Sequence, residues 1–200
     1  MAATHRRLRI EADGGSRGNP GIAGYGALVR DEGGRVIAER AAPLGKASNN
    51  VAEYSGLIAG LQAAEVIDPG ARITVAMDSK LVVEQMSGRW KIKHADMRTL
   101  ALEAKEIIER IVAAGGSVDF TWIPRERNKA ADALSNDGMD GRTIRRDAGL
   151  SEELAADRLA EEEHPGEPAI AAQPRAVPPV GEPTRIILVR HGVTAFTEQG

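Results

Sequence analysis

Apolar and charged residues alternate over residues 7–12, which is the pattern of a strand with one buried face. Two more short apolar runs follow at residues 25–30 and 35–40, on either side of Asp31-Glu32-Gly33-Gly34. Glycines between two such runs favour a hairpin turn. The three segments therefore predict an antiparallel meander.

Helical periodicity begins after a predicted loop at residues 45–50. Apolar positions recur at three- and four-residue spacing over residues 51–67, with Asn50 as N-cap and Glu53 in the capping-box position. The later elements are predicted in the order strand, helix, helix, strand, helix, at residues 73–77, 80–86, 97–113, 117–123 and from 128 onward. In the last strand, Val118, Phe120 and Trp122 share one face.

This order of elements predicts an α/β fold. Three meander strands followed by two strands that are reached through helices imply a five-stranded mixed sheet with helices on both faces. We expect this domain to span residues 1–141, followed by an acidic and then proline-rich linker at residues 142–183. A further apolar strand, residues 184–189, then leads into Arg190-His191-Gly192.

Composition narrows the class of protein. A hydrophobic content of 42% is enough to bury a core, but aromatics are only 3%, so Ala, Val, Ile and Leu must build it. The absence of cysteine excludes disulfides and thiolate metal sites, and fits a cytoplasmic protein. No apolar run approaches the roughly 18 residues that span a membrane, and the N-terminus does not have the apolar segment of a signal peptide.

Four carboxylates occupy comparable positions in these elements. Asp13 and Asp78 each follow an apolar strand, and Asp13 precedes a glycine-rich stretch that suits an abrupt turn. Glu53 and Asp132 fall in the predicted first turns of helices, where the helix dipole stabilises an acid by roughly 0.3–1 kcal/mol. Each acid alone therefore has an ordinary explanation as a solvated turn residue or a helix-end residue.

Their convergence has no such ordinary explanation. If the first and fourth strands are neighbours in the sheet, their ends bring Asp13 and Asp78 together. Gathered carboxylates repel one another unless a cation compensates their charge. A site made only of oxygen ligands favours a hard ion, Mg²⁺ or Mn²⁺, over zinc.

The motifs also carry a resemblance to a known family. Asp13-Gly14-Gly15-Ser16-Arg17-Gly18-Asn19-Pro20-Gly21, Asn49-Asn50-Val51-Ala52-Glu53, Asp78-Ser79 and Asn128-Lys129-Ala130-Ala131-Asp132-Ala133-Leu134 together resemble type 1 ribonuclease H, in the family's order over residues 8–140. The resemblance implies an endonuclease that hydrolyses the RNA strand of RNA–DNA hybrids with two Mg²⁺ ions, leaving 5′-phosphate and 3′-hydroxyl ends.

The resemblance also assigns roles to the four acids. Asp13 bridges both metals, Glu53 holds the metal on the leaving-group side, Asp78 binds on the nucleophile side, and Asp132 completes that nucleophile-side shell. Two cations about 4 Å apart can stabilise the attacking and leaving oxygens of an in-line displacement.

Substrate contacts are expected from the loops around these acids. The candidates are Gly14, Gly15, Ser16, Asn19, Ser48, Asn49, Asn50, Lys80, Arg89, Trp90 and Lys91. Backbone groups near the glycines can read 2′-hydroxyls, which distinguish RNA from DNA. Ser48 and Lys80 are equally well explained as a helix cap and a solvated charge. For Trp90, packing beneath a helix end is slightly favoured over stacking on a base.

One departure from the family pattern concerns product release. Many members carry a His in a loop before the last Asp, but this chain has Pro124-Arg125-Glu126-Arg127 there. The segment resembles a branch in which an Arg is thought to assist instead, so Arg125 or Arg127 is the candidate.

The C-terminal segment resembles the start of a second family. Residues 184–200, with Arg190-His191-Gly192, resemble the opening of a histidine phosphatase, and the combination resembles actinobacterial bifunctional proteins that join the two domains. Seventeen residues are too few for phosphatase activity, so we expect His191 to be inert in this chain. The sequence therefore predicts a monomeric nuclease acting on RNA–DNA hybrids without membrane association. The alternative is a catalytically weak nucleic-acid-binding module on the same fold.

Overall fold

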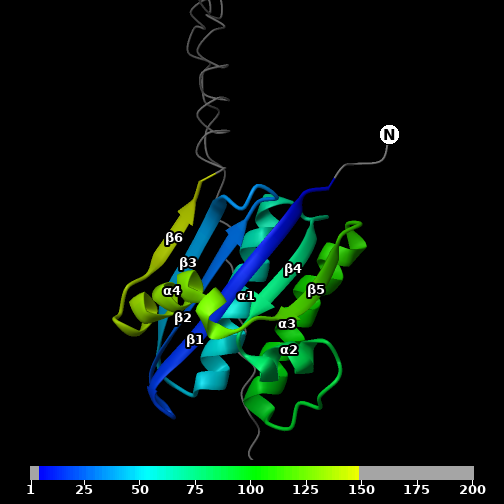
Figure 1. Cartoon of the computed structure of the whole chain (residues 1–200). Coiled ribbons are helices and arrows are strands. Elements are labelled where there is room, and N and C mark those ends of the chain that lie inside the picture. The colour runs from blue at the N-terminus through cyan, green and yellow to red at the C-terminus, as the bar shows by residue number, and fades with distance from the viewer. Residues whose placement is uncertain (1–4, 149–200) are drawn as a thin grey trace, which may run out of the picture. The chain divides into compact units, whose positions relative to one another are not determined.

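The computed structural model describes residues 5–148 and contains one mixed sheet (Figure 1). The sheet has six strands in the order β5-β4-β1-β2-β3-β6. The strands are β1 (Arg7–Gly18), β2 (Gly21–Arg30), β3 (Val36–Ala47), β4 (Arg72–Met77), β5 (Ser117–Trp122) and β6 (Ile144–Asp147). β1, β2 and β3 form the predicted antiparallel meander, and β4 and β5 run parallel to β1.

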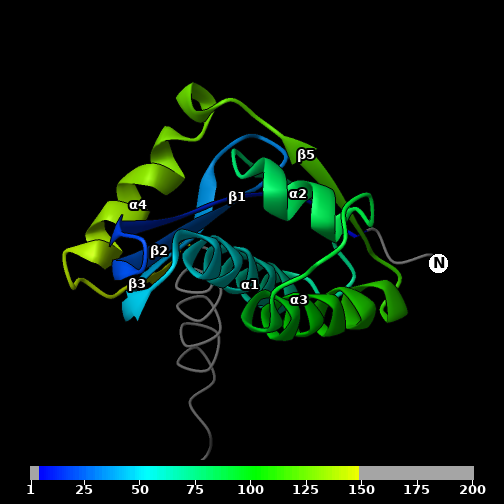
Figure 2. The same cartoon turned by 90° about the horizontal axis from the view of Figure 1, so that it is seen from below.

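Helices lie on both faces of this sheet, as predicted. They are α1 (Asn49–Ile67), α2 (Lys80–Met86), α3 (Ala95–Ala113) and α4 (Lys129–Met139), with a short 3₁₀ turn, η1 (Arg125–Arg127), before α4. Figure 2 shows α1 and α3 on one side of the sheet and α4 on the other. No helix in residues 5–148 is long and apolar enough to cross a membrane.

The main core lies between the sheet and α1. Leu8, Ile10 and Ala12 are buried on this side of β1, as the alternation predicts. α1 buries residues around most of its circumference because β1 contacts one side and α3 covers another. As the composition requires, the core is mainly aliphatic, and Tyr54 is its largest fully buried side chain. A smaller cluster under α4 joins Leu28, Ala41, Ala131 and Leu134.

The predicted five-stranded sheet was one strand short. β6 pairs antiparallel with β3, and Arg40 donates to Asp147 at 2.5 Å across that pair. The sheet therefore continues beyond Gly141, where we expected the domain to end. The segment Ile144-Arg145-Arg146-Asp147 is too polar and too short to show a strand by its hydrophobic pattern. The remaining linker from residue 149 and the phosphatase-like residues 184–200 lie outside the described part.

Two predicted loops are strand instead. β1 runs through Asp13 to Gly18, and β3 runs to Ala47, because the long β1–β2–β3 ladders continue through both segments. The turn occurs at Gly18, whose φ of 98° suits glycine, and at the following Asn19–Pro20. The glycines after Asp13 therefore form strand backbone rather than an abrupt turn.

The start of α1 also differs from the prediction. Ser48, not Asn50, is the N-cap, and its Oγ accepts a hydrogen bond from the Val51 N–H at 3.3 Å. Glu53 is therefore not in the first turn and does not form a capping box. In β5, Trp122 does not follow Val118 and Phe120 into the half-buried layer, since its side chain is 49% exposed. It lies at the end of an edge strand, where its Nε1 donates to the Asp78 carbonyl at 3.1 Å.

Candidate active site

Strand register brings the first two acids together. The parallel ladder between β1 and β4 ends with Ala12 opposite Met77. Asp13 is the next residue of β1, and Asp78 directly follows the last residue of β4, so both carboxylates lie beside the end of β4. Asp13 is also held from its other side, because it pairs with Gly26 of β2.

Glycines let α1 approach β1 closely enough to bring Glu53 to Asp13. A Cβ on Gly14 would lie 2.1 Å from the carbonyl carbon of Ala52 and 2.2 Å from the Glu53 nitrogen. On the helix, a Cβ on Gly56 would lie 2.6 Å from the Asp13 carbonyl oxygen. Contacts this short are impossible for any residue with a side chain. The acid on α1 therefore depends on a glycine in each element.

Glycines also allow α4 to pack closely against the opposite face of the sheet. A Cβ on Gly26 would lie 2.4 Å from the Ser135 nitrogen and 2.6 Å from the Ala131 carbonyl oxygen. Gly138 of α4 faces the Ala42 carbonyl oxygen just as closely, at 2.7 Å from its virtual Cβ. Backbone therefore rests on backbone, and Asp132 in the first turn of α4 is brought toward Asp13 of β1.

All four predicted acids line one hollow of about 290 Å³. Asp13 and Glu53 are buried, at 7% and 6% exposure, while Asp78 and Asp132 are half-buried. Four residues separated by up to 119 positions in the chain thus share one site. The lining of this hollow is mainly polar.

Three of the acids are held by neutral or positive partners. The Ser135 hydroxyl donates to Asp13 Oδ2 at 2.5 Å, and Asn128 Nδ2 donates to Asp78 Oδ1 at 2.6 Å and to the Ala12 carbonyl at 2.9 Å. Arg125 forms an ion pair with Asp132 at 2.6 Å. These contacts orient the carboxylates and reduce the repulsion among them.

Burial and mutual repulsion favour the protonated forms of the two innermost acids. Burial, followed by the charges of Asp78 and Asp132, raises the pKa of Asp13 to about 6, although the Ser135 hydrogen bond opposes the shift. Burial, followed by the charges of Asp13 and Asp78, raises the pKa of Glu53 well above its ordinary value. Two acids with raised pKa in one hollow indicate a functional site.

The chemistry of this donor set fits a hard divalent cation. Glu53 Oε2 is buried and has no hydrogen-bond partner, so this carboxyl has a free oxygen that a cation could bind. Between residues 5 and 148, however, no three His, Asp or Glu side chains are gathered closely enough to enclose an ion as they stand. The Arg125–Asp132 ion pair accounts for part of this, since it turns one acid toward a guanidinium.

The predicted substrate residues fall into two groups. Gly14, Gly15, Ser16 and Asn49 line the same hollow as the acids. Next to it, the side-chain oxygen of Asn19 accepts the Asn49 N–H at 3.3 Å.

Six other predicted substrate contacts do not line that hollow: Ser48, Asn50, Lys80, Arg89, Trp90 and Lys91. Of the two candidates for product release, Arg125 lines the hollow and Arg127 does not. Ser48 serves as the cap of α1, which is the alternative that the sequence left open.

The segment after α2 is exposed and tied back to the core. Trp90 is 48% exposed, so it is not packed beneath the helix end as the sequence slightly favoured, whereas Ile92 does pack against the core. Arg89 forms an ion pair with Glu84 at 2.5 Å. Gln85 joins the Lys91 carbonyl to the Tyr54 hydroxyl of α1 through hydrogen bonds of 3.3 and 2.8 Å.

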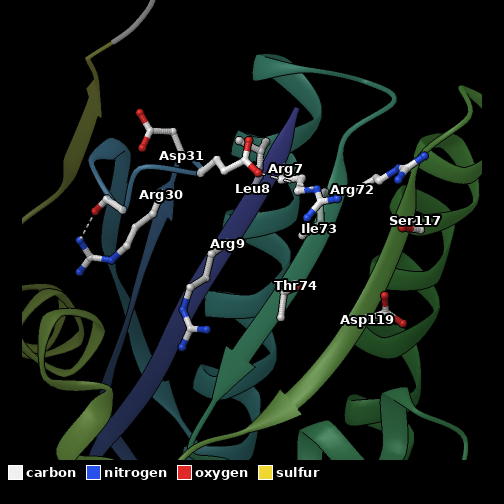
Figure 3. Close-up of a pocket in the computed structure, with 12 residues that line it drawn as sticks. Arg7, Leu8, Arg9, Arg30, Asp31, Arg72, Ile73, Thr74, Ser117 and Asp119 are labelled. Carbon is white, nitrogen blue, oxygen red and sulfur yellow. Dashed lines mark hydrogen bonds and ion pairs between the residues drawn. The ribbon is translucent and has the colours of Figure 1, made fainter. Parts of the chain in front are cut away.

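A larger hollow, of about 450 Å³, lies over a part of the sheet that α4 does not cover, toward the Arg7 end of β1 (Figure 3). Its arginines are largely balanced, since Arg9 and Arg30 both contact the buried Glu11 at 3.2 Å. Arg7 stands 3.9 Å from Glu32, and both side chains are mostly exposed. Asp31, Glu32 and Asp119 also line this space, but none of these three acids is buried. We therefore place the chemistry at the smaller hollow, where Asp13 and Glu53 are buried.

Sequence reasoning missed the residues that support the acids. Ser135 and Asn128 are buried and hydrogen-bonded to Asp13 and Asp78, and Asn136 donates to the Asp132 carbonyl oxygen at 2.8 Å. The sequence did contain a signal for them. Asn128, the N-cap of α4, and positions 132 and 135 within α4 recur at helical spacing and therefore lie on one side of the helix. Polar residues on a buried side of a helix indicate hydrogen-bond partners across the sheet.

Comparisons with known proteins place this sheet order and its four gathered acids in a class of proteins that process nucleic acids. The family model described as Reverse transcriptase-like matches residues 11–138. The solved N-terminal RNase H domain of Rv2228c from Mycobacterium tuberculosis has 51% identity and a TM-score of 0.63, covering 68% of this chain and 94% of that one. LC11-RNase H1, solved in complex with an RNA/DNA hybrid, has 37% identity and a TM-score of 0.62, covering 67% and 97%.

The chain therefore belongs to the ribonuclease H family. Among curated relatives, Bifunctional protein Rv2228c of Mycobacterium tuberculosis is 45% identical over 199 residues, which cover 96% of this chain. The chain spans 49% of the length of that relative.

Proposed function

We propose that this protein is a ribonuclease H, an endonuclease that hydrolyses the RNA strand of RNA–DNA hybrids and leaves 5′-phosphate and 3′-hydroxyl ends. The observation that carries the proposal is the meeting of Asp13, Glu53, Asp78 and Asp132 in one hollow. Family membership and the hybrid bound to the related LC11 enzyme support the substrate class.

The four acids would hold two Mg²⁺ ions, with Mn²⁺ as a substitute. Asp13 would bridge the two ions, Glu53 would serve the leaving-group side, and Asp78 with Asp132 would serve the nucleophile side. The unpaired Glu53 Oε2 and the raised pKa of Asp13 support this, since both groups need a positive partner to be stable as anions. Bound cations lower the pKa of water and neutralise charge that develops on a phosphoryl group.

The protein's own groups prepare the site for this chemistry. Asn128 fixes the Asp78 carboxylate against the strand end through its two hydrogen bonds. Arg125 would exchange its contact with Asp132 for a phosphate oxygen when substrate enters, which is the basis for giving it, rather than Arg127, the product-release role. Burial of Asp13 and Glu53 excludes bulk water from the innermost part of the hollow.

Backbone and amide groups beside the acids would select RNA. Gly14, Gly15 and Ser16 present strand backbone along one side of the hollow, and Asn49 stands at the start of α1. Polar groups at this position can hydrogen-bond a 2′-hydroxyl in the shallow minor groove, which a DNA strand lacks. Trp90 and Lys91 are exposed and would contact the duplex farther from the cut.

A substrate panel tests the proposal. Labelled RNA–DNA hybrid, duplex DNA and duplex RNA are incubated with the protein in Mg²⁺ or in EDTA. We expect cutting of the hybrid's RNA strand alone, only with Mg²⁺, and its loss in Asp13→Asn. Asp119→Asn, which changes an exposed acid on β5, serves as the matched control and should cut normally. Hybrid binding without metal-dependent cutting would instead support the catalytically weak binding module.

A further inference from the structure

Ser135 is a buried hydroxyl that faces the site and that the four-acid description does not use. Its side chain is 1% exposed, and its Oγ lies 2.5 Å from Asp13 Oδ2 and 3.0 Å from the carbonyl oxygen of Asp132. A hydroxyl has one proton to donate. The carboxylate is both closer and the stronger acceptor, so the proton goes to Asp13.

The position of Ser135 is fixed by the backbone around it. Its nitrogen lies only 2.4 Å from the position that a Cβ of Gly26 would take, and Gly26 is the residue of β2 that pairs with Asp13. Helix α4 therefore presses this residue against the strand position next to the acid. A small side chain at position 135 on the inner face of α4 necessarily meets the Asp13 carboxylate.

The terminal torsion of an aspartate is broad, so an unrestrained carboxylate rotates readily. Anchoring Oδ2 to a fixed hydroxyl removes that freedom and sets the direction of both oxygens. The carboxylate is therefore already oriented before a cation arrives.

We propose that Ser135 is a positioning residue for the divalent-cation site, and that its hydroxyl holds the Asp13 carboxylate in the orientation that binds the cation. The inference rests on the proposed function, because it assumes that Asp13 is a metal ligand. Groups that orient metal ligands in this way change metal affinity by about 10–100-fold when they are removed. A residue that only packed α4 would change stability and leave metal affinity unchanged.

The test compares Ser135→Ala and Ser135→Cys with the matched control Ser55→Ala. Ser55 is also a helical serine whose Oγ donates to a backbone carbonyl, that of Val51 at 2.9 Å, but in the described structure it bonds no carboxylate. Alanine favours the helix, and cysteine keeps the volume near that of serine with only a weak donor, so at least one variant retains the packing of α4.

Three quantities are measured on the full chain: Mn²⁺ affinity by calorimetry without substrate, the Mg²⁺ concentration for half-maximal cleavage of hybrid, and the melting temperature in EDTA. We expect both Ser135 variants to bind Mn²⁺ about tenfold more weakly and to need about tenfold more Mg²⁺. Their cleavage rate should recover largely at saturating Mg²⁺. Ser55→Ala should match the wild type in both metal measurements.

The outcomes separate this inference from the function on which it rests. Wild-type metal affinity in both Ser135 variants would overturn it, even if their melting temperatures fell, because that result describes a packing role alone. If the wild-type protein itself neither binds Mn²⁺ nor cuts hybrid, the proposed function fails and the inference fails with it.

Discussion

At the residue scale, burying carboxylates costs free energy, and this cost determines how the stability of the protein should depend on pH and on bound cations. Asp13 and Glu53 are each less than a tenth exposed, and Glu53 has a buried oxygen without a partner. Without a cation these groups repel one another and favour their protonated forms. The acids of the proposed metal site therefore destabilise the metal-free fold.

We predict that the metal-free protein loses stability as the pH rises toward neutrality. Asp13 has an ordinary pKa of 3.8 and a folded-state pKa of about 6, so the folded protein binds this proton more tightly than the unfolded one. The resulting stabilisation is complete below pH 3.8 and is lost as the pH rises through about 6. Its size is on the order of 1–3 kcal/mol. Thermal unfolding in EDTA between pH 4.5 and about 8 measures it; a melting temperature that instead rises through pH 6 would contradict the burial argument.

Removing the charge of Asp13 should restore the stability that the metal-free protein loses near neutral pH. We predict that Asp13→Asn melts at a higher temperature than the wild type in EDTA at about pH 8, by several degrees for a gain on the order of 1–3 kcal/mol. Asp119→Asn should leave the melting temperature unchanged because that acid is exposed. The comparison is made by calorimetry, and equal melting temperatures for the wild type and Asp13→Asn would show that the charge is not costly.

At the scale of elements, close backbone approach is what assembles the site. Gly14 and Gly56 admit α1 to β1, and Gly26 admits α4 to β2. Each acid on a helix thus depends on a glycine on a strand. The site can be lost without touching any residue that contacts substrate.

A substitution at Gly26 tests this dependence. We predict that Gly26→Ala displaces α4, destabilises the fold by roughly 2 kcal/mol or more, and lowers cleavage at least tenfold, since the new Cβ meets backbone atoms within 2.6 Å. Gly33→Ala is the matched control, because its Cβ would meet only the Asp31 side chain at 3.4 Å. Chemical denaturation and hybrid cleavage are the measurements. A Gly26→Ala protein with native stability and activity would refute the close-packing account.

The cap of α1 gives a second test at this scale. Ser48→Ala removes the hydrogen bond to Val51 N, so we predict a loss of about 1 kcal/mol in unfolding free energy. Ser48→Asp should retain most of the stability, since aspartate is an equally good N-cap. If Ser48→Asp is as unstable as Ser48→Ala, the hydroxyl is not acting as the cap.

The sequence was sufficient for the meander, the helix order and the four acids, because these features are local patterns or motifs. It could not show that β1 continues past Asp13, since strand pairing rather than propensity carries residues 14–18 into the sheet. It missed Ser135 and Asn128 because their partners, Asp13 and Asp78, lie 122 and 50 positions away. It missed β6 because that strand is short, polar and formed only by pairing with β3.

At the scale of the whole molecule, the last strand of the sheet extends the folded domain beyond Gly141. β6 adds a strand to the β3 edge, with Arg40–Asp147 and Arg146–Glu39 ion pairs of 2.5 and 2.9 Å. The Ala148 N–H also donates to the Ile37 carbonyl at 2.9 Å. These residues belong to the fold although they follow Asp132, the last of the four site acids in the chain.

Two truncations test this boundary. We predict that a chain ending at Ala148 folds and still cuts hybrid, because it keeps the whole β6 ladder. A chain ending at Gly141 loses the β6 ladder, and we expect it to be less stable by roughly 1–3 kcal/mol. The melting temperature and cleavage rate of the two are compared directly; equal stability would show that β6 contributes nothing to the fold.

The central claim is that Asp13, Glu53, Asp78 and Asp132 form one two-cation site. The most direct test is anomalous X-ray diffraction from crystals of Asp132→Asn grown with RNA–DNA hybrid and Mn²⁺, in which the substitution slows turnover. We predict Mn²⁺ peaks within coordinating distance of Asp13, Glu53 and Asp78, beside a phosphate of the RNA strand. Mn²⁺ bound elsewhere, or hybrid bound with no ion among these three acids, would contradict it.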